Sequence, residues 1–306
     1  MARTLPETPL ALALRRDEPL ARHTYMRLGG PAAYYAEPPT IEALMQITSW
    51  TLSEGITLRI LGGGSNILVA DAGITAVVLS LRAACNEVTF EDMRVTAGGA
   101  VMLPALARAA ASHDLGGLEF AIGIPGTIGG ALQSNAGIGD GRDIGSLVES
   151  VEVPSADSIY ALSRSELDFA YRTSSLHGTD AIVLRATLSL EPRPRTECDA
   201  EMTRLLEARQ ASQPTAERNA GSIFRNPEGD AAGRLIEAAG CKGLTVRGAR
   251  VSDLHANFIV HDGTATAADI AALMLAVRTR VAAVSGVTLT PEVEWWGDDQ
   301  PPEVFR

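Results

Sequence analysis

The sequence is poor in several residue types that mark common protein classes. It has only three cysteines, Cys85, Cys198 and Cys241, whose odd number and scattered positions indicate reduced thiols in a cytoplasmic protein. The five histidines form no pair at metal-ligand spacing, so we expect no metal site. The formal net charge of -11 argues against a broad nucleic-acid or anionic-membrane surface, because such surfaces need an excess of Lys and Arg.

Long apolar runs are also missing. The apolar run at residues 10–14 is too short for a signal peptide, and no stretch approaches the length of a membrane span. Lys242 is the only lysine, so nearly all positively charged side chains are arginines. The planar guanidinium group of arginine binds carboxylates and phosphates through two parallel hydrogen bonds better than lysine does. These features favour a cytoplasmic protein without a nucleic-acid or membrane partner, and we expect it to be a monomer.

Two glycine-rich runs stand out against these absences. Residues 116–137, GGLEFAIGIPGTIGGALQSNAG, hold seven glycines and one proline among small apolar residues. The other run, LGGGSNILV at 61–69, comes first in the chain; it directly follows a strand-like segment and can turn several backbone N–H groups into one concavity. Each run alone could be an ordinary turn between strands. Together they favour a ligand that carries phosphate.

The order of secondary structure predicts a mixed α+β chain. We expect a helix capped by Thr40 and a helix opened by the capping box Thr266-x-x-Asp269. Pro192 and Pro194 predict a linker. The remaining expected elements are strands over 58–61, 74–81, 148–153, 181–190 and 287–296, a hairpin from 88, and helices over 103–113, 201–211 and 231–239.

Three polar segments could carry chemistry, although each has a plainer interpretation. Arg172 lies among aromatic residues and could be a stacked surface arginine. Ser222 lies in GSIFRNP, which could be a turn that enters a helix. Glu292 and Glu294 share one face if they lie on a strand, so both would be solvated or both would face a pocket. Spacing alone supports only an α/β protein with a phosphate-rich ligand.

Seven motifs in order give the chain a more specific resemblance. They are T-x-x-R-x-G-G-P at 24–31, LGGGSNILV at 61–69, GLEFAIGIPGTIGGALQSNAG at 117–137, YRTS at 171–174, GSIFRNP at 221–227, HANFIV at 255–260 and LTPEVEWWG at 289–297. From about residue 24 to 297 the chain resembles the UDP-N-acetylenolpyruvoylglucosamine reductases, flavoenzymes that make UDP-N-acetylmuramate for bacterial peptidoglycan.

The resemblance implies an α+β fold with a two-lobed FAD-binding domain of the vanillyl-alcohol oxidase and p-cresol methylhydroxylase type, followed by a substrate-binding domain. We expect a loosely packed lead-in at 1–22, the FAD-binding domain at 23–192 with lobes at about 23–84 and 85–192, and the substrate-binding domain at 193–306. No segment completes G-x-G-x-x-G after a strand, which fits the lack of a separate nicotinamide domain.

The resemblance also implies the ligands and their contacts. FAD, held non-covalently, is reduced by NADPH, and the reduced flavin in turn reduces the small molecule UDP-N-acetylglucosamine enolpyruvate. The expected FAD contacts are Arg27, Gly62, Gly63, Gly64, Ser65, Asn66, Ile122, Pro125, Gly126, Thr127, Gly129, Gly130, Ser134, Asn135 and Ala136. The expected substrate contacts are Tyr171, Arg225, Asn226 and His255.

Catalysis, by the same resemblance, rests on three residues. Hydride from flavin N5 adds to C3 of the enolpyruvyl group, and negative charge collects on its carboxylate. Arg172 and a protonated Glu292 are expected at that carboxylate, which requires a raised pKa for Glu292. Ser222 is expected to deliver the proton to C2.

The chain departs from the family pattern at several positions. His23 stands where the family often has asparagine. Arg225 stands where the family often has lysine, so the positive charge is kept but is spread over a planar guanidinium group instead of one ammonium group. After Gly137 the family usually continues with an aromatic residue and a glycine, and this chain has Ile138-Gly139-Asp140-Gly141 instead. The interval between Ser174 and Gly221 has no tyrosine, as in the subgroup without a tyrosine-bearing substrate loop.

Two other functions compete with the reductase. An FAD-dependent oxidase of the same fold would often tether its flavin through a histidine in the glycine turn, and residues 62–66 contain none. A catalytically silent flavin or nucleotide-sugar binder would not need Arg172, Ser222 and Glu292 together. The sequence therefore favours the reductase.

Overall fold

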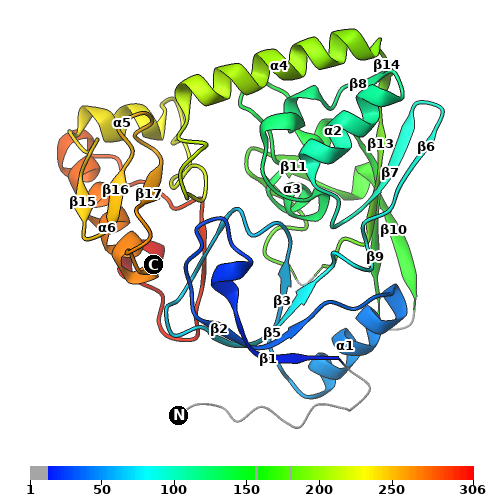
Figure 1. The fold of residues 1–306 in the computed structure, drawn as a ribbon, viewed down its shortest axis with the longest axis horizontal. Helices are drawn as coiled ribbons and strands as arrows, with labels where there is room; N and C mark the ends of the chain where they lie inside the picture. Colours follow the sequence, from blue (N-terminus) through cyan, green and yellow to red (C-terminus); the bar gives the residue numbers. More distant parts are fainter. Residues whose placement is uncertain (1–12, 156–157, 180) are drawn as a thin grey trace.

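The computed structural model describes residues 13–155, 158–179 and 181–306. The chain forms three units that surround a common centre in Figure 1: a first unit around β1, β2, β5 and β3, a second unit around α2, α3 and the strands β6 to β13, and a C-terminal unit around α5 and α6. The predicted α+β class is confirmed. Across the described residues no helix is long and apolar enough to cross a membrane.

The first unit is a four-stranded sheet in the order β1-β2-β5-β3. Strand β1 runs antiparallel to β2, whereas β2 and β3 run parallel to β5. The Thr40 hydroxyl accepts from the N–H of Ala43 and caps the helix that covers one face, as predicted. The elements are β1 (Arg15–Pro19), β2 (Pro31–Ala36), α1 (Ile41–Ser53), β3 (Leu58–Leu61) and β5 (Ile74–Ser80).

The predicted loose packing of the lead-in is wrong for its second half. Strand β1 pairs with β2 from Arg15 to Pro19, and Leu20 is 1% exposed in the core of the first unit. Charge and proline made this segment look unstructured, but its backbone completes the sheet edge, Leu20 is buried and Leu14 is partly buried. Residues 1–12 of the predicted lead-in lie outside the described residues.

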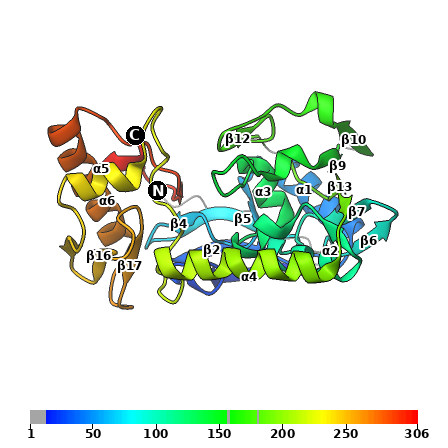
Figure 2. The same ribbon diagram turned by 90° about the horizontal axis from the view of Figure 1, so that it is seen from above.

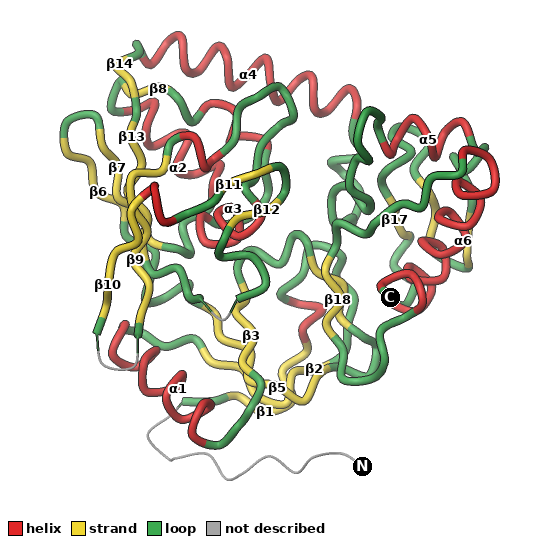
Figure 3. The backbone as a smooth tube through the Cα atoms, turned by 180° about the vertical axis from the view of Figure 1, so that it is seen from behind, coloured by secondary structure: helices red, strands yellow, loops and turns green. Residues whose placement is uncertain are grey.

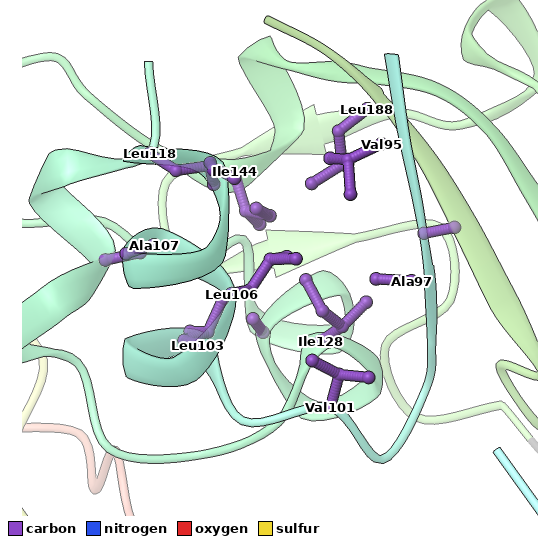
Figure 4. Close-up of a cluster of buried hydrophobic side chains, with 14 of the residues drawn as sticks. Val95, Ala97, Val101, Leu103, Leu106, Ala107, Leu118, Ile128, Ile144 and Leu188 are labelled. Atoms are coloured by element: carbon purple, nitrogen blue, oxygen red, sulfur yellow. The ribbon is translucent and has the colours of Figure 1, made fainter. Parts of the chain in front are cut away.

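The second unit is a five-stranded antiparallel sheet in the order β10-β9-β13-β7-β6. Figure 4 shows Leu106 and Ile128, from the two covering helices, beneath Val95 and Leu188 of the sheet. The hairpin from Val88 is confirmed. The elements are β6 (Val88–Glu91), β7 (Arg94–Gly98), α2 (Leu103–Ser112), α3 (Ile128–Ser134), β9 (Val148–Pro154), β10 (Ile159–Ser163) and β13 (Arg185–Ser189).

Short pieces complete the second unit. Two small ladders pair β8 (Leu115–Gly116) with β14 (Glu191–Pro192) and β11 (Phe169–Ala170) with β12 (Thr173–Ser174). The 3-10 turns of the chain are η1 (Leu20–Arg22), η2 (Glu119–Gly123), η3 (Ile144–Ser146), η4 (Arg164–Glu166) and η5 (Glu303–Phe305). The strand predicted over 181–190 is shorter than expected, and only 185–189 pair.

The C-terminal unit packs two helices against a three-stranded sheet, β15-β16-β17. The predicted capping box is confirmed, because Thr266 and Asp269 each accept from the other's backbone N–H. The elements are α5 (Ala232–Ala238), β15 (Thr245–Val246), β16 (Ala249–Val251), β17 (Ile259–His261), α6 (Ala267–Ser285) and β18 (Glu294–Trp296).

Strand β18 joins the C-terminal unit to the first unit. It pairs in parallel with β4 (Ile67–Val69), so the chain's last strand lies beside the segment that follows the first glycine run (Figure 3). The strand predicted over 287–296 is wrong for 287–293. Those residues instead run beside residues 223–225 through single contacts, including the Phe224–Pro291 bridge.

Helix α4 (Arg195–Ser212) connects the second unit to the C-terminal unit and begins directly after Pro194 (Figure 2). It is longer than the predicted 201–211. Its buried residues Cys198 and Met202 belong to the core of the second unit. The domain limits predicted from the sequence therefore stay a prediction. Helix α4 follows the predicted limit at 192 in the sequence, yet its buried residues pack into the second unit.

Candidate active site

A cleft of about 2390 Å³ lies between the three units. Pockets for one drug-sized ligand typically occupy roughly 300–1,000 Å³, so this cleft has room for a large cofactor and a second ligand together. Its walls include both glycine runs, the β11–β12 turn, the last two turns of α4, and residues 220–228 and 290–297.

The two glycine runs touch each other at the floor of this cleft. A Cβ added to Gly63 would lie 2.9 Å from the Cα of Gly126, and the hydroxyl of Ser65 donates to the carbonyl of Pro125 at 3.0 Å. Gly64 has a φ of +67°, and a side chain there would overlap the carbonyl oxygen of His23. Glycine is therefore required at Gly63 by close backbone approach and at Gly64 by its conformation as well.

The first glycine run also leaves donors free. Gly63, Gly64 and Ser65 lie outside any helix or strand, and within the described part of the chain no protein acceptor takes a hydrogen bond from their backbone N–H groups. Consecutive free N–H groups in a loop form a favourable site for phosphate oxygens. These residues thus fit a pyrophosphate group such as that of FAD.

Arg172 reaches the cleft from the turn between β11 and β12. Its φ of +55° is uncommon for a residue with a side chain, and its Nη1 donates to the carbonyl of Gly137 at 3.2 Å. The turn is held by Asn135, whose Nδ2 donates to Ala170 at 3.1 Å and whose Oδ1 accepts from the N–H of Gly145 at 2.9 Å. The buried amide of Asn135 thus ties the turn that carries Arg172 to the backbone at Gly145.

Arg172 and Glu292 lie within ion-pair distance of each other across the cleft. Nε of Arg172 lies 2.9 Å from Oε1 of Glu292. The N–H is not aimed at that oxygen, however, and within the described residues the buried Nε atoms of Arg172 and Arg225 make no hydrogen bond of good geometry. Buried donors without an acceptor are costly, so both guanidinium groups are suited to an anionic ligand.

Glu292 and Ser222 are brought together by backbone pairing. The N–H of Glu292 donates to Ile223 at 2.8 Å, and the N–H of Arg225 donates to Thr290 at 2.9 Å. Ser222, Arg225 and Glu292 all line the cleft. Glu292 and Glu294 both line the cleft, but the expected shared strand face is wrong: strand β18 starts only at Glu294, which is exposed, whereas Glu292 is mostly buried.

Burial shifts the pKa of Glu292. Loss of solvent raises its pKa above the usual value, and the opposing attraction of Arg172 and Arg225 is too small to reverse this shift. A raised pKa favours the neutral carboxyl, which can donate a hydrogen bond to a ligand oxygen.

The cleft has the opposite charge balance from the chain as a whole. The sequence carries a net charge of -11, yet the cleft lining has no aspartate and only three glutamates, Glu228, Glu292 and Glu294. Its arginines number seven: Arg22, Arg27, Arg59, Arg82, Arg172, Arg209 and Arg225. Anionic ligands are therefore attracted to this surface rather than to the rest of the molecule.

Most residues proposed from the sequence line the cleft. They are Arg27, Gly62, Gly63, Gly64, Ser65, Asn66, Pro125, Gly126, Thr127, Gly129, Gly130, Ser134, Ala136, Tyr171, Arg172, Ser222, Arg225, Asn226 and Glu292. Tyr171 is exposed at the edge of the cleft, and Oδ1 of Asn226 already accepts from the N–H of Ala232.

Three of the proposed residues lie behind the lining. Ile122 is buried in the core of the second unit, and Asn135 holds the Arg172 turn. His255 packs edge-on against Phe258, with its Nδ1 accepting from the N–H of Asn257. Burial lowers the pKa of His255. These residues can support the site but do not form its surface.

Sequence reasoning missed Asn257 and Arg209. Asn257 is 3% exposed, and its amide accepts from the N–H of Phe224 at 3.0 Å and donates to the Phe224 carbonyl at 2.8 Å. It therefore fixes the segment that carries Ser222. Its place in the HANFIV motif was the available signal, whereas nothing in the local sequence marked Arg209. Among the described residues no cluster of three or more metal-ligating side chains is present.

Comparison with known proteins identifies the family. The family described as FAD binding domain matches residues 32–158, and that described as UDP-N-acetylenolpyruvoylglucosamine reductase, C-terminal domain, matches residues 213–296. The chain is 44% identical to UDP-N-acetylenolpyruvoylglucosamine reductase 2 of Symbiobacterium thermophilum over 93% of this chain and 92% of that protein. It is 44% identical to the reductase of Moorella thermoacetica, over 95% and 96%.

A solved structure agrees with these relatives. The crystal structure of UDP-N-acetylenolpyruvylglucosamine reductase (MurB) from Thermus caldophilus matches with a TM-score of 0.79 and 35% identity, covering 94% of this chain and 100% of that one. The fold predicted from the seven motifs, an FAD-binding domain followed by a C-terminal α+β domain, is confirmed. The chain belongs to the UDP-N-acetylenolpyruvoylglucosamine reductase family.

Proposed function

We propose that this protein uses NADPH and FAD to reduce the enolpyruvyl group of UDP-N-acetylglucosamine enolpyruvate, giving UDP-N-acetylmuramate. One observation carries the proposal. Arg172, Glu292 and the segment with Ser222 come together in the same cleft as a loop with free backbone N–H groups. A phosphate-binding loop and a carboxylate-binding pair in one cleft match a cofactor that carries a pyrophosphate beside a substrate that carries a carboxylate.

FAD would be held by the two glycine runs. When bound, it takes a hydride from NADPH and passes it to C3 of the enolpyruvyl group. The free N–H groups of Gly63, Gly64 and Ser65 would hold its pyrophosphate. Residues 125–130 would lie along the cofactor, because they share the cleft floor with that loop.

The substrate carboxylate would lie between Arg172, Arg225 and Glu292. The two guanidinium groups offer buried donors without acceptors, and a neutral Glu292 adds an O–H donor. As negative charge moves onto the carboxylate during hydride addition, these donors bind it more strongly than in the ground state. This difference lowers the barrier.

Ser222 would then give its hydroxyl proton to C2. A serine hydroxyl is a weak acid, so its position must be fixed for it to act. The amide of Asn257 fixes the backbone two residues away, and the pairing with residues 290–292 fixes the other side.

We further propose that the protein acts as a cytoplasmic monomer, where its nucleotide substrates are found. Light scattering on a size-exclusion column tests the monomer. Because the chain lacks the tyrosine-bearing loop, closure over the diphosphate would come from the C-terminal unit. Tyr171 and Asn226, at the cleft edge, remain proposed substrate contacts.

Anaerobic stopped-flow absorbance near 450 nm tests the function. After reduction with NADPH, addition of UDP-N-acetylglucosamine enolpyruvate should restore the oxidised flavin band and yield the muramate product. Flavin that stays reduced until air is admitted would instead support the oxidase. Ser222→Ala should keep the flavin and slow this reoxidation by about 10²-fold or more, whereas Ser285→Ala, on an exposed position of α6, should not.

A further inference from the structure

Helix α4 presents one cation to the cleft. Leu205, Ala208, Arg209 and Ser212 all line the cleft and are spaced by three and four residues, so they form one face of the helix. Figure 1 shows this helix reaching from the second unit to the C-terminal unit above the centre of the molecule. Arg209 is the one charged residue of this face.

Arg209 contacts the glycine run at 116–137 through Gly123. A Cβ added to Gly123 would lie 3.3 Å from its Cδ and 3.5 Å from its Nη1, so the guanidinium lies over this glycine. Gly123 is two residues from Pro125, whose carbonyl accepts from the Ser65 hydroxyl. The side chain is therefore close to the place where the two glycine runs meet.

No anionic group in the described part of the chain is paired with this arginine. Arg209 is half-buried, and within the described residues no carboxylate forms an ion pair with it and no acceptor takes a hydrogen bond from its side chain. Burial lowers its pKa, and the one neighbouring titratable group is Tyr25, whose backbone N–H donates to Gly64. A half-buried cation that faces the cleft without a protein partner is available to bind an anionic ligand.

We propose that Arg209 is a phosphate-binding residue of the cleft, which contacts the diphosphate of a bound nucleotide at the rim of the glycine loop. This proposal rests on the proposed function for the choice of ligands, all of which carry diphosphate. The same chemistry could come from the resident FAD or from the sugar nucleotide, and the two sources can be measured separately.

The test uses the flavin-loaded protein with Arg209→Met, which keeps the alkyl contact with Gly123 and removes the charge. Release of FAD is followed by the fluorescence of free flavin after dilution, and binding of UDP by calorimetry. We expect one of the two affinities to fall about 10- to 100-fold, the loss typical of a hydrogen bond to a charged group. Arg209→Lys should retain most of that affinity.

Arg195→Met is the matched control, because Arg195 is on the same helix with its side chain 64% exposed. It should leave both affinities within about twofold. A loss in FAD retention assigns Arg209 to the cofactor, and a loss in UDP binding assigns it to the sugar nucleotide. If neither changes by more than about twofold in Arg209→Met or in a second neutral variant, Arg209→Gln, the proposal is wrong. Neither measurement needs turnover, so a protein that binds FAD but fails to reduce the sugar nucleotide would refute the proposed function alone.

Discussion

Replacement of Asn257 should separate the two halves of the catalytic cycle. Its side chain makes two hydrogen bonds to the backbone of Phe224, at 3.0 and 2.8 Å, and is 3% exposed. Asn257→Ala leaves a buried N–H and a buried C=O without partners. Each costs about 1–3 kcal/mol, so we expect a loss of about 2–6 kcal/mol in the free energy of unfolding.

The same change should affect chemistry at Ser222. The segment from Ser222 to Arg225 would lose its fixed position relative to Glu292, so proton delivery should slow by about 10-fold or more. Reduction of the flavin by NADPH needs neither residue and should proceed within about twofold of the wild-type rate. Urea unfolding and anaerobic stopped-flow absorbance measure the two effects on one preparation.

Two variants make the test decisive. Asn257→Asp keeps an acceptor for the N–H of Phe224 but places a second oxygen against its carbonyl. This carboxyl should have a raised pKa, so the stability lost relative to wild type should be regained as the pH falls and the carboxyl becomes a donor. Asn86→Ala, at an exposed position, should change stability by less than about 0.5 kcal/mol. Equal slowing of both half-reactions in Asn257→Ala would refute the positioning role.

Three further predictions follow from the charges. Because burial raises the pKa of Glu292, ionisation opposes folding, so the melting temperature of Glu292→Gln relative to wild type should rise as the pH increases above about 4.5; a falling difference would contradict the shift. Arg142 pairs with Glu201 on α4 and its carbonyl accepts from Ile138, next to the Gly137 carbonyl that binds Arg172; Arg142→Ala should slow flavin reoxidation several-fold, unlike Arg204→Ala. Raising the ionic strength from about 0.05 to 0.5 M should lower kcat/KM for the anionic substrate more than kcat, and equal effects would argue against electrostatic attraction.

The features that could be predicted from the sequence are those that depend on neighbouring residues in the chain. The capping box needs only the spacing of Thr266 and Asp269 and is confirmed. The glycine runs were recognisable because a backbone that must pass close to another backbone excludes side chains, and Gly63 meets Gly126 in this way.

The features that could not be predicted depend on residues far apart in the chain. Glu292 and Glu294 differ in environment because residue 292 pairs with Ile223 and residue 294 with β4, two partners that no local pattern reveals. His255 lies in a family motif, but its ring turns toward Phe258 and Gly233 rather than the cleft. A motif identifies the segment, whereas packing decides which of its side chains reach the site.

The arginines show that the charge of the cleft differs in sign from the net charge of the chain. A net charge of -11 argues against a broad anionic partner, yet it conceals a cleft whose arginines outnumber its glutamates seven to three. The acidic residues are placed elsewhere, many of them in surface ion pairs such as Asp230 with Arg234. Of the cleft arginines, Arg172 alone has a carboxylate within ion-pair distance among the described residues, and that carboxyl is one whose pKa burial raises. The cleft therefore keeps its positive charge available for ligands, and the excess of acid on the remaining surface directs anions toward it.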